Sequence, residues 1–183
     1  IVFLKNTIGI KYQLDPQSAG KTNATFTKVQ DENTGDNQGV AELAHNIAYY
    51  PYSSSVACNI SESEYMLDVY LPESQTYVKD SFGPGSFPMI SVSESNNIPF
   101  KNVCGAMKLL LKGGQKVSSI RLEGKNNERI AGRAVVKAAV PNTTPSITMS
   151  ADATMSITLN CENGVQLSEE APTEFIISIP PTV

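Results

Sequence analysis

The chain has 183 residues with a net charge of −4, and only 17% of its residues are charged. Its 14 lysines and arginines are scattered and not clustered as in proteins that bind nucleic-acid phosphates, so we expect no nucleic-acid partner. No apolar run reaches about 18 residues, so we expect no membrane-spanning helix. This length suits a single domain over residues 1–183, which would bury roughly 70% of the surface of the unfolded chain.

The first part of the chain has little regular alternation of apolar and polar residues. From 39 to 49 the apolar residues recur near helical spacing, but we expect a strand there, with Ile47 and Tyr49 on one side. Stretches rich in turn-forming residues predict loops at 15–21, 31–39, 83–88 and 93–97.

An oxygen-rich segment in the 31–39 loop resembles in part the calcium loop of an EF-hand. With Asp31 as position one, Asn33 is at position three and Glu42 at position twelve. Position six of such a loop is a glycine, but here it is Asp36. We therefore favour an exposed turn-rich loop and expect no metal or cofactor, with calcium bound by these four residues as the alternative.

Tyr49, Tyr50 and Tyr52 surround Pro51 and are the candidate binding surface of the chain. Exposed tyrosine rings stack on sugars or anchor a protein partner. Alternation predicts that at least one of the three belongs to the core, so a structural role at the end of a strand also stays open.

Period-two alternation predicts half-buried strands later in the chain. The strand at 65–71 has Tyr65, Leu67, Val69 and Leu71 on one face. Further strands are expected at 146–150, 154–161 and 174–179. Their predicted inward residues are Ile147, Met149, Met155, Ile157, Leu159, Cys161, Phe175, Ile177 and Ile179.

The clearest turn signal lies between 107 and 123. Apolar runs at 107–112 and 117–123 flank Gly113-Gly114-Gln115-Lys116, which predicts a β-hairpin. A turn at 124–127 is expected to end the second strand, and 129–140 to supply another strand or two. Turn signals then recur about every 8–12 residues, so we expect an all-β fold, a Greek-key sandwich of about seven strands.

The three cysteines, Cys58, Cys104 and Cys161, form no CxxC pair, and the chain has one histidine, His45. A structural zinc site is therefore not expected. We favour buried free thiols, with a Cys104–Cys161 disulfide as the alternative. A single histidine without a G-x-S-x-G motif does not favour hydrolase chemistry, so we predict no enzymatic activity and a surface or edge position for His45.

Seven segments follow one another in the order of a known family. They are AYYPYS at 48–53, LPESQTY at 71–77, FPMI at 87–90, FKNVCG at 100–105, IRLEGKNNERIAG at 120–132, TLNC at 158–161 and IPP at 179–181. In this order and spacing, they resemble the fimbrillin-like surface proteins of Bacteroidales bacteria, which are related to type V pili. The resemblance covers about residues 24–183, and none of its segments is a catalytic or ligand motif.

The resemblance implies a transthyretin-like β-sandwich, normally the first of two domains, in a protein exported to the outer membrane as a lipoprotein. Family members are pilus stalk, anchor or tip subunits or related surface proteins, so the expected partners are other fimbrial subunits or a host surface ligand. Polymerising members lose an N-terminal strand, and the groove accepts a strand from a neighbour.

The segments that normally precede Ile1 and follow Pro180-Pro181 in this family are missing, as is a lipidated cysteine. We therefore expect a mature or trimmed first domain that serves in adhesion and assembles by β-strand addition. The alternative is a module of an outer-membrane lipoprotein that captures a glycan or a host protein without polymerising.

Overall fold

The computed structural model of the chain describes residues 1–183 except 5–8, 30–42, 55, 62–63, 139–142 and 182–183. The described residues form four β-sheets and one short 3-10 turn, η1 (Pro16–Ser18), and contain no α-helix, so the all-β class is confirmed. They hold fifteen strands, β1 to β15, where about seven were expected. Strands such as β7 (Ser74–Thr76) and β9 (Lys101–Asn102) are too short to show alternation.

The largest sheet has six antiparallel strands in the order β3-β2-β1-β4-β8-β9. Besides β9, its strands are β1 (Val2–Leu4), β2 (Gly9–Leu14), β3 (Phe26–Lys28), β4 (Asn46–Tyr50) and β8 (Met89–Ser93). Of the strand expected at 39–49, only the end is found, as β4; residues 43–45 are not in a strand, and 39–42 lie outside the described residues. The two residues predicted to share its inward side, Ile47 and Tyr49, are both buried.

A four-stranded antiparallel sheet has the order β13-β12-β6-β5. Its strands are β5 (Ala57–Ser61), β6 (Glu64–Leu71), β12 (Gly132–Ala138) and β13 (Ser146–Met149). The predicted alternation of β6 is confirmed, since all four of its inward residues are buried. The region 129–140 supplies one strand, β12, and the strand expected at 146–150 is β13.

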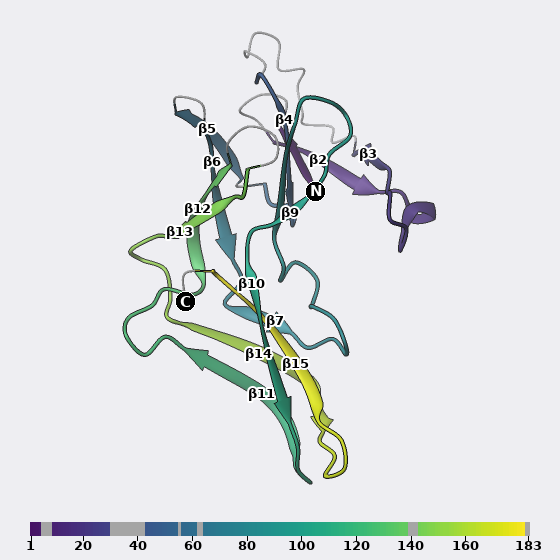
Figure 1. Ribbon diagram of the computed structural model, residues 1–183, viewed down its shortest axis with the longest axis vertical. Helices are drawn as coiled ribbons and strands as arrows, with labels where there is room; N and C mark the ends of the chain where they lie inside the picture. The colour runs from purple at the N-terminus through teal and green to yellow at the C-terminus, as the bar shows by residue number, and fades with distance from the viewer. Residues whose placement is uncertain (5–8, 30–42, 55, 62–63, 139–142, 182–183) are drawn as a thin grey trace.

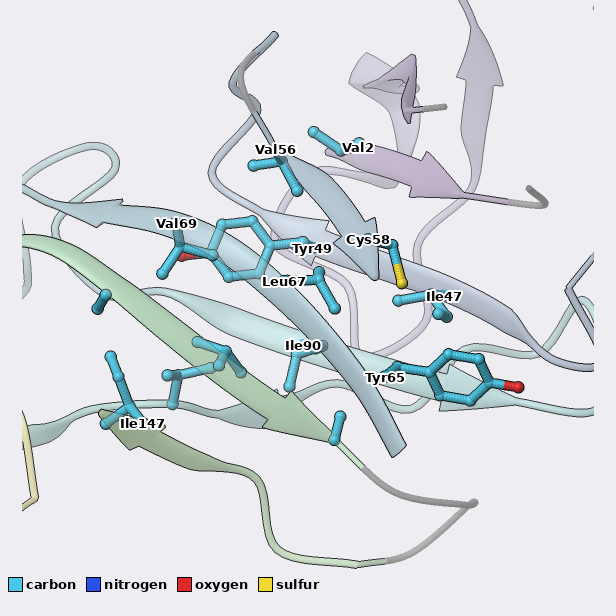
Figure 2. Close-up of a cluster of buried hydrophobic side chains, with 14 of the residues drawn as sticks. Val2, Ile47, Tyr49, Val56, Cys58, Tyr65, Leu67, Val69, Ile90 and Ile147 are labelled. Atoms are coloured by element: carbon cyan, nitrogen blue, oxygen red, sulfur yellow. The ribbon is translucent and has the colours of Figure 1, made fainter. Parts of the chain in front are cut away.

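The six-stranded and four-stranded sheets both contribute to the larger hydrophobic cluster, which we call the first core (Figure 2). It takes side chains from β1, β4 and β8 of one sheet and from every strand of the other. Its buried members are Val2, Leu4, Ile47, Tyr49, Val56, Cys58, Tyr65, Leu67, Val69, Leu71, Ile90, Val92, Val103, Cys104, Ala134, Val136, Ala138 and Ile147.

Two narrower sheets occupy the lower part of the view in Figure 1. One is an antiparallel pair of β10 (Gly105–Leu111) and β15 (Thr173–Ile179), which we call the β10–β15 ribbon. The other has the order β11-β14-β7, with β11 (Lys116–Glu123), β14 (Ser156–Gln166) and a parallel β7. Both sheets contribute to the second core, whose buried members are Ile130, Ala131, Ile157, Leu159, Cys161, Phe175 and Ile177.

The predicted hairpin is wrong. Its two arms are β10 and β11, but β10 pairs with β15 and β11 pairs with β14. The 113–115 connection therefore passes from one sheet to another. It is held by the 167–168 segment, where the Gly113 N–H donates to the Ser168 carbonyl at 3.2 Å and the Leu167 N–H to the Gln115 carbonyl at 3.0 Å. A glycine turn marks where a chain reverses, but partner strands are selected by packing.

The other local predictions in this region are largely confirmed. β11 ends at Glu123, and Asn127 in the following turn has a φ of 65°, a conformation that asparagine tolerates. The inward residues of β14 and β15 are those expected, except that Met155 precedes β14 and is 38% exposed. In the described part of the chain, no helix is long and apolar enough to cross a membrane.

Candidate binding surfaces

The sequence candidates for metal and catalytic chemistry are four possible calcium ligands and His45. The possible calcium ligands Asp31, Asn33, Asp36 and Glu42 lie outside the described residues. Within the described residues, no three His, Cys, Asp or Glu side chains are grouped to hold a metal ion. His45, for which a surface or edge position was expected, is half-buried just before β4, with its Nδ1 2.6 Å from the Tyr65 hydroxyl. This bond joins the segment before β4 to β6 and has a structural role.

The three cysteines are buried free thiols, as the sequence favoured, and the alternative Cys104–Cys161 disulfide is not formed. Cys58 and Cys104 belong to the first core and Cys161 to the second. Burial raises the pKa of the Cys58 and Cys104 thiols to about 11 and also raises the pKa of Cys161. A protonated, buried thiol is a poor nucleophile and a poor metal ligand, so these residues act as core side chains.

The three candidate tyrosines lie on different sides of the six-stranded sheet. Tyr49 points into the first core, is 2% exposed, and its hydroxyl has no hydrogen-bond partner among the described residues. Tyr50 lies on the opposite face of β4, where its hydroxyl accepts a hydrogen bond from the Gly85 N–H at 3.0 Å. Tyr52 is 40% exposed, with the Lys11 ammonium 5.0 Å from the centre of its ring. Only Tyr50 and Tyr52 can therefore form a binding surface.

Tyr50 and Tyr52 line a groove of about 490 Å³, which we call the tyrosine groove. The strand register shows which face it occupies, because Val2 of the first core pairs with Tyr49, so the neighbouring Tyr50 points away from that core. Tyr50 is paired with Met89, and Leu14 with Phe26, which places all four on the outer face of the sheet. The lining is mostly apolar and consists of Ile1, Lys11, Tyr12, Gln13, Leu14, Phe26, Tyr50, Tyr52, Met89 and Phe100.

A more polar hollow of about 520 Å³ adjoins this groove and shares Ile1, Tyr12 and Phe26 with it. It adds Asn46 and Asn96, whose amide groups have both donors and acceptors. The residues that β2 and β3 contribute to this surface were not predicted from the sequence. The alternation of Ile10, Tyr12 and Leu14 was the signal that could have found them, but it is short and stands in a weakly patterned region.

A second surface is the outer side of β10 in the β10–β15 ribbon. The Ser178 N–H donates to Gln75 Oε1 at 2.9 Å, and Gln75 Nε2 donates to the Ser178 carbonyl at 2.8 Å, so the backbone of Ser178 faces away from β10. Antiparallel pairs alternate, and Ser178 is paired with Ala106. The backbone groups of Ala106, Lys108 and Leu110 therefore face away from β15. No strand among the described residues pairs with this side of β10.

The two edges of the ribbon are covered to different extents. On the β15 side, Gln75 occupies the backbone of Ser178, and the Tyr77 ring lies 5.1 Å from the ring of Phe175. On the β10 side, Leu109 and Leu111 are only half-buried although they pack against the second core. β11 is an edge strand of the other sheet, and three of its residues that pack against the second core are also only half-buried: Val117, Ile120 and Leu122. The second core is thus least covered beside β10 and β11.

No protein-family model matches this chain, and neither a curated protein nor a solved structure matches it.

Proposed function

We propose that the protein is a non-enzymatic subunit of a cell-surface adhesion or fimbrial assembly, and that it joins other subunits by β-strand addition to the β10 edge. We place it with the fimbrillin-like proteins, as a transthyretin-like Greek-key sandwich exported to the outer membrane. Attachment to the membrane would come through a lipidated precursor. The ordered segments of the sequence support this family, and the open β10 edge supports the mode of assembly.

The observation that carries the proposal is the coincidence of free backbone groups with uncovered apolar side chains. An edge strand with unpaired N–H and C=O groups is a template for another chain. The β10 edge offers three such residues, Ala106, Lys108 and Leu110, directly beside the half-buried Leu109 and Leu111. A strand added here forms backbone hydrogen bonds with β10 while its inward side chains cover the second core.

The incoming strand needs alternating apolar residues. Since β10 places Leu109 and Leu111 inward and Lys108 and Leu110 outward, a paired strand must place every second residue over the second core. Each Å² of apolar surface that becomes buried contributes roughly 25 cal/mol. Backbone pairing alone would give affinity without selectivity, so the apolar pattern of the donor determines which strand fits.

The test uses a substitution that removes a backbone N–H from the open side of β10. Proline lacks an N–H and is tolerated in a strand where that group faces solvent, as it does at Lys108. Lys108→Pro should therefore keep the pairing with β15 but prevent a strand from docking on β10. The matched control is Lys108→Ala, which also removes the 2.8 Å ion pair with Glu174 but keeps the N–H.

The measurement is the pattern of SDS-resistant oligomers in the envelope of the cells that make the protein. We expect a ladder for the unmodified protein and for Lys108→Ala, and monomers for Lys108→Pro. A ladder that survives Lys108→Pro would exclude β10 as the docking edge, and a monomeric unmodified protein would exclude assembly. A far-UV circular dichroism spectrum of each variant checks that the sheets are intact.

A second candidate is a surface module that captures a host protein without polymerising, and the tyrosine groove favours it. Eight of the ten lining residues are aliphatic or aromatic, and only Lys11 and Gln13 end in an ammonium or an amide group. Such a lining suits the apolar side chains of a protein partner better than a sugar. Tyr52→Ser should abolish capture in this case, while the protein remains a monomer and Lys108→Pro has no effect. Capture that is unchanged by Tyr52→Ser would exclude the groove.

A further inference from the structure

Another hollow, with no lining residue in common with the tyrosine groove, lies on the four-stranded sheet. It encloses about 810 Å³, within the range of roughly 300–1,000 Å³ that ligand pockets occupy. Its side chains come from β6 and β12 and from the segments that precede β5 and follow β13. We call it the Tyr70 hollow, and its polar and aromatic residues are Ser53, Asp68, Tyr70, Arg133, Ser150 and Asp152.

The strand register gathers three of these residues on one face. Arg133 of β12 is paired with Tyr70 of β6, and Asp68 lies two residues along β6 and therefore on the same face. That face is the one opposite the first core, because the intervening Val69 is buried in the core. The pleat of two central strands, and not a loop, thus fixes the positions of an aromatic ring, a guanidinium group and a carboxylate.

The charged groups of the hollow have no partners among the residues that the structure describes. Among the described residues, no ion pair or side-chain hydrogen bond involves the side chains of Asp68, Arg133 or Asp152. Tyr70 is different, since its hydroxyl donates to Glu73 Oε1. That bond ties down the phenol oxygen and holds a ring that is still 53% exposed. The hollow therefore has an aromatic ring beside the charged side chains of Asp68, Arg133 and Asp152, to which the described residues supply no partner.

The mixture of charges determines which ligand fits. The carboxylates of Asp68 and Asp152 would repel a phosphate, and the guanidinium of Arg133 would repel a metal cation. A neutral polyol is repelled by neither group, because its hydroxyls can donate hydrogen bonds to the carboxylates and accept them from the guanidinium. The apolar C–H face of a sugar ring also matches the face of an exposed tyrosine.

We propose that the Tyr70 hollow binds a neutral sugar residue of a glycan, with the ring of Tyr70 stacked on the sugar and Asp68, Arg133 and Asp152 bonded to its hydroxyls. This inference goes beyond the assembly function, because it uses the outer face of the four-stranded sheet and not the β10 edge. A subunit that is joined to its neighbours through β10 keeps this face for a ligand.

The experiment titrates the whole chain with four probes, the methyl glycosides of glucose, galactose and mannose and free N-acetylglucosamine, while amide shifts are followed by NMR. We expect at least one probe to change the NMR chemical shifts of the backbone amides of residues 68–70 and 133. The change should saturate, with a Kd on the order of 1 mM for a single sugar. Inorganic phosphate and calcium chloride serve as the charged comparison ligands.

Variants separate stacking from other effects. Tyr70→Leu and Arg133→Gln should each weaken binding by roughly tenfold or more, whereas Tyr70→Phe keeps the ring and should stay within about twofold. Arg121→Gln, a change at an exposed strand arginine elsewhere, is the matched control and should bind as the unmodified protein does. The proposal is overturned if no probe shifts these amides, if phosphate or calcium shifts them in place of the sugars, or if Tyr70→Leu binds normally.

Discussion

The first core lies between sheets of six and four strands, whereas the second lies between sheets of two and three strands. In the first, even the three-residue β1 has its inward side chains, Val2 and Leu4, fully buried, because strands flank it on both sides. In the second, most inward residues of β14 and β15 are buried, although Val165 and Ile179 are not, whereas all those of β10 and β11 that pack against this core are only half-buried. A layer two strands wide consists entirely of edges, so its core needs cover from outside.

The largest expected effect tests whether the two cores form one cooperative unit. Leu67→Ala in the first core and Phe175→Ala in the second each remove a fully buried side chain. Each should lower the free energy of unfolding by about 2–5 kcal/mol, through lost burial and the cavity left behind. The measurement is urea unfolding followed by circular dichroism. A single transition for both variants fits one domain over 1–183, and a separate early transition in Phe175→Ala would divide the cores into two units.

The cysteines give a probe of opening in each region. Cys58 and Cys104 belong to the first core and Cys161 to the second, so their labelling by a thiol reagent in native protein reports local unfolding of each. The narrower sheets cover the second core less completely than the wider sheets cover the first. We therefore expect Cys161 to be labelled on the order of tenfold faster than Cys58 and Cys104, which corresponds to an opening free energy lower by about 1.4 kcal/mol. The measurement is mass spectrometry of labelled peptides over time. Equal rates would contradict the difference between the regions.

The same thiols predict how stability depends on pH. Burial raises the pKa of Cys58 and Cys104 to about 11 from an ordinary value of 9.0, so between these two values the unfolded chain loses protons that the folded protein retains. The free energy of unfolding should therefore be unaffected by these thiols below pH 9 and fall as the pH rises to 11. The double variant Cys58→Ala, Cys104→Ala should have a shallower alkaline slope in urea titrations. An unchanged slope would contradict the role of burial.

The smallest expected effect compares two phenols within the first core. The Tyr49 hydroxyl is buried without a described partner, so Tyr49→Phe should leave stability unchanged or raise it by about 1 kcal/mol. The Tyr65 hydroxyl bonds His45, so the matched Tyr65→Phe should lower stability by about 1 kcal/mol. Thermal unfolding of both variants is the measurement, and a loss in Tyr49→Phe would mean that its hydroxyl has a partner.

Alternation along single strands was predictable because it depends only on neighbouring residues and on the pleat. This is why the inward residues of β6 and most of those of β14 and β15 were identified correctly, and why one of the three tyrosines was expected in the core. Binding surfaces were less predictable. The tyrosine groove combines residues as distant as Leu14 and Phe100, and the Tyr70 hollow depends on a register between β6 and β12 that no local pattern specifies.

The sequence by itself determined the all-β class, the breaks between strands at 113–115 and 124–127, and the inward side chains of β6 and most of those of β14 and β15. Only the tertiary structure decided that β10 and β11 separate at the glycine turn to pair with β15 and β14. The physical reason is that a turn fixes the direction of two strands locally, whereas their partners are chosen by the burial of apolar faces contributed by segments far away in the chain. That choice left the outer edge of β10 without a partner strand among the described residues.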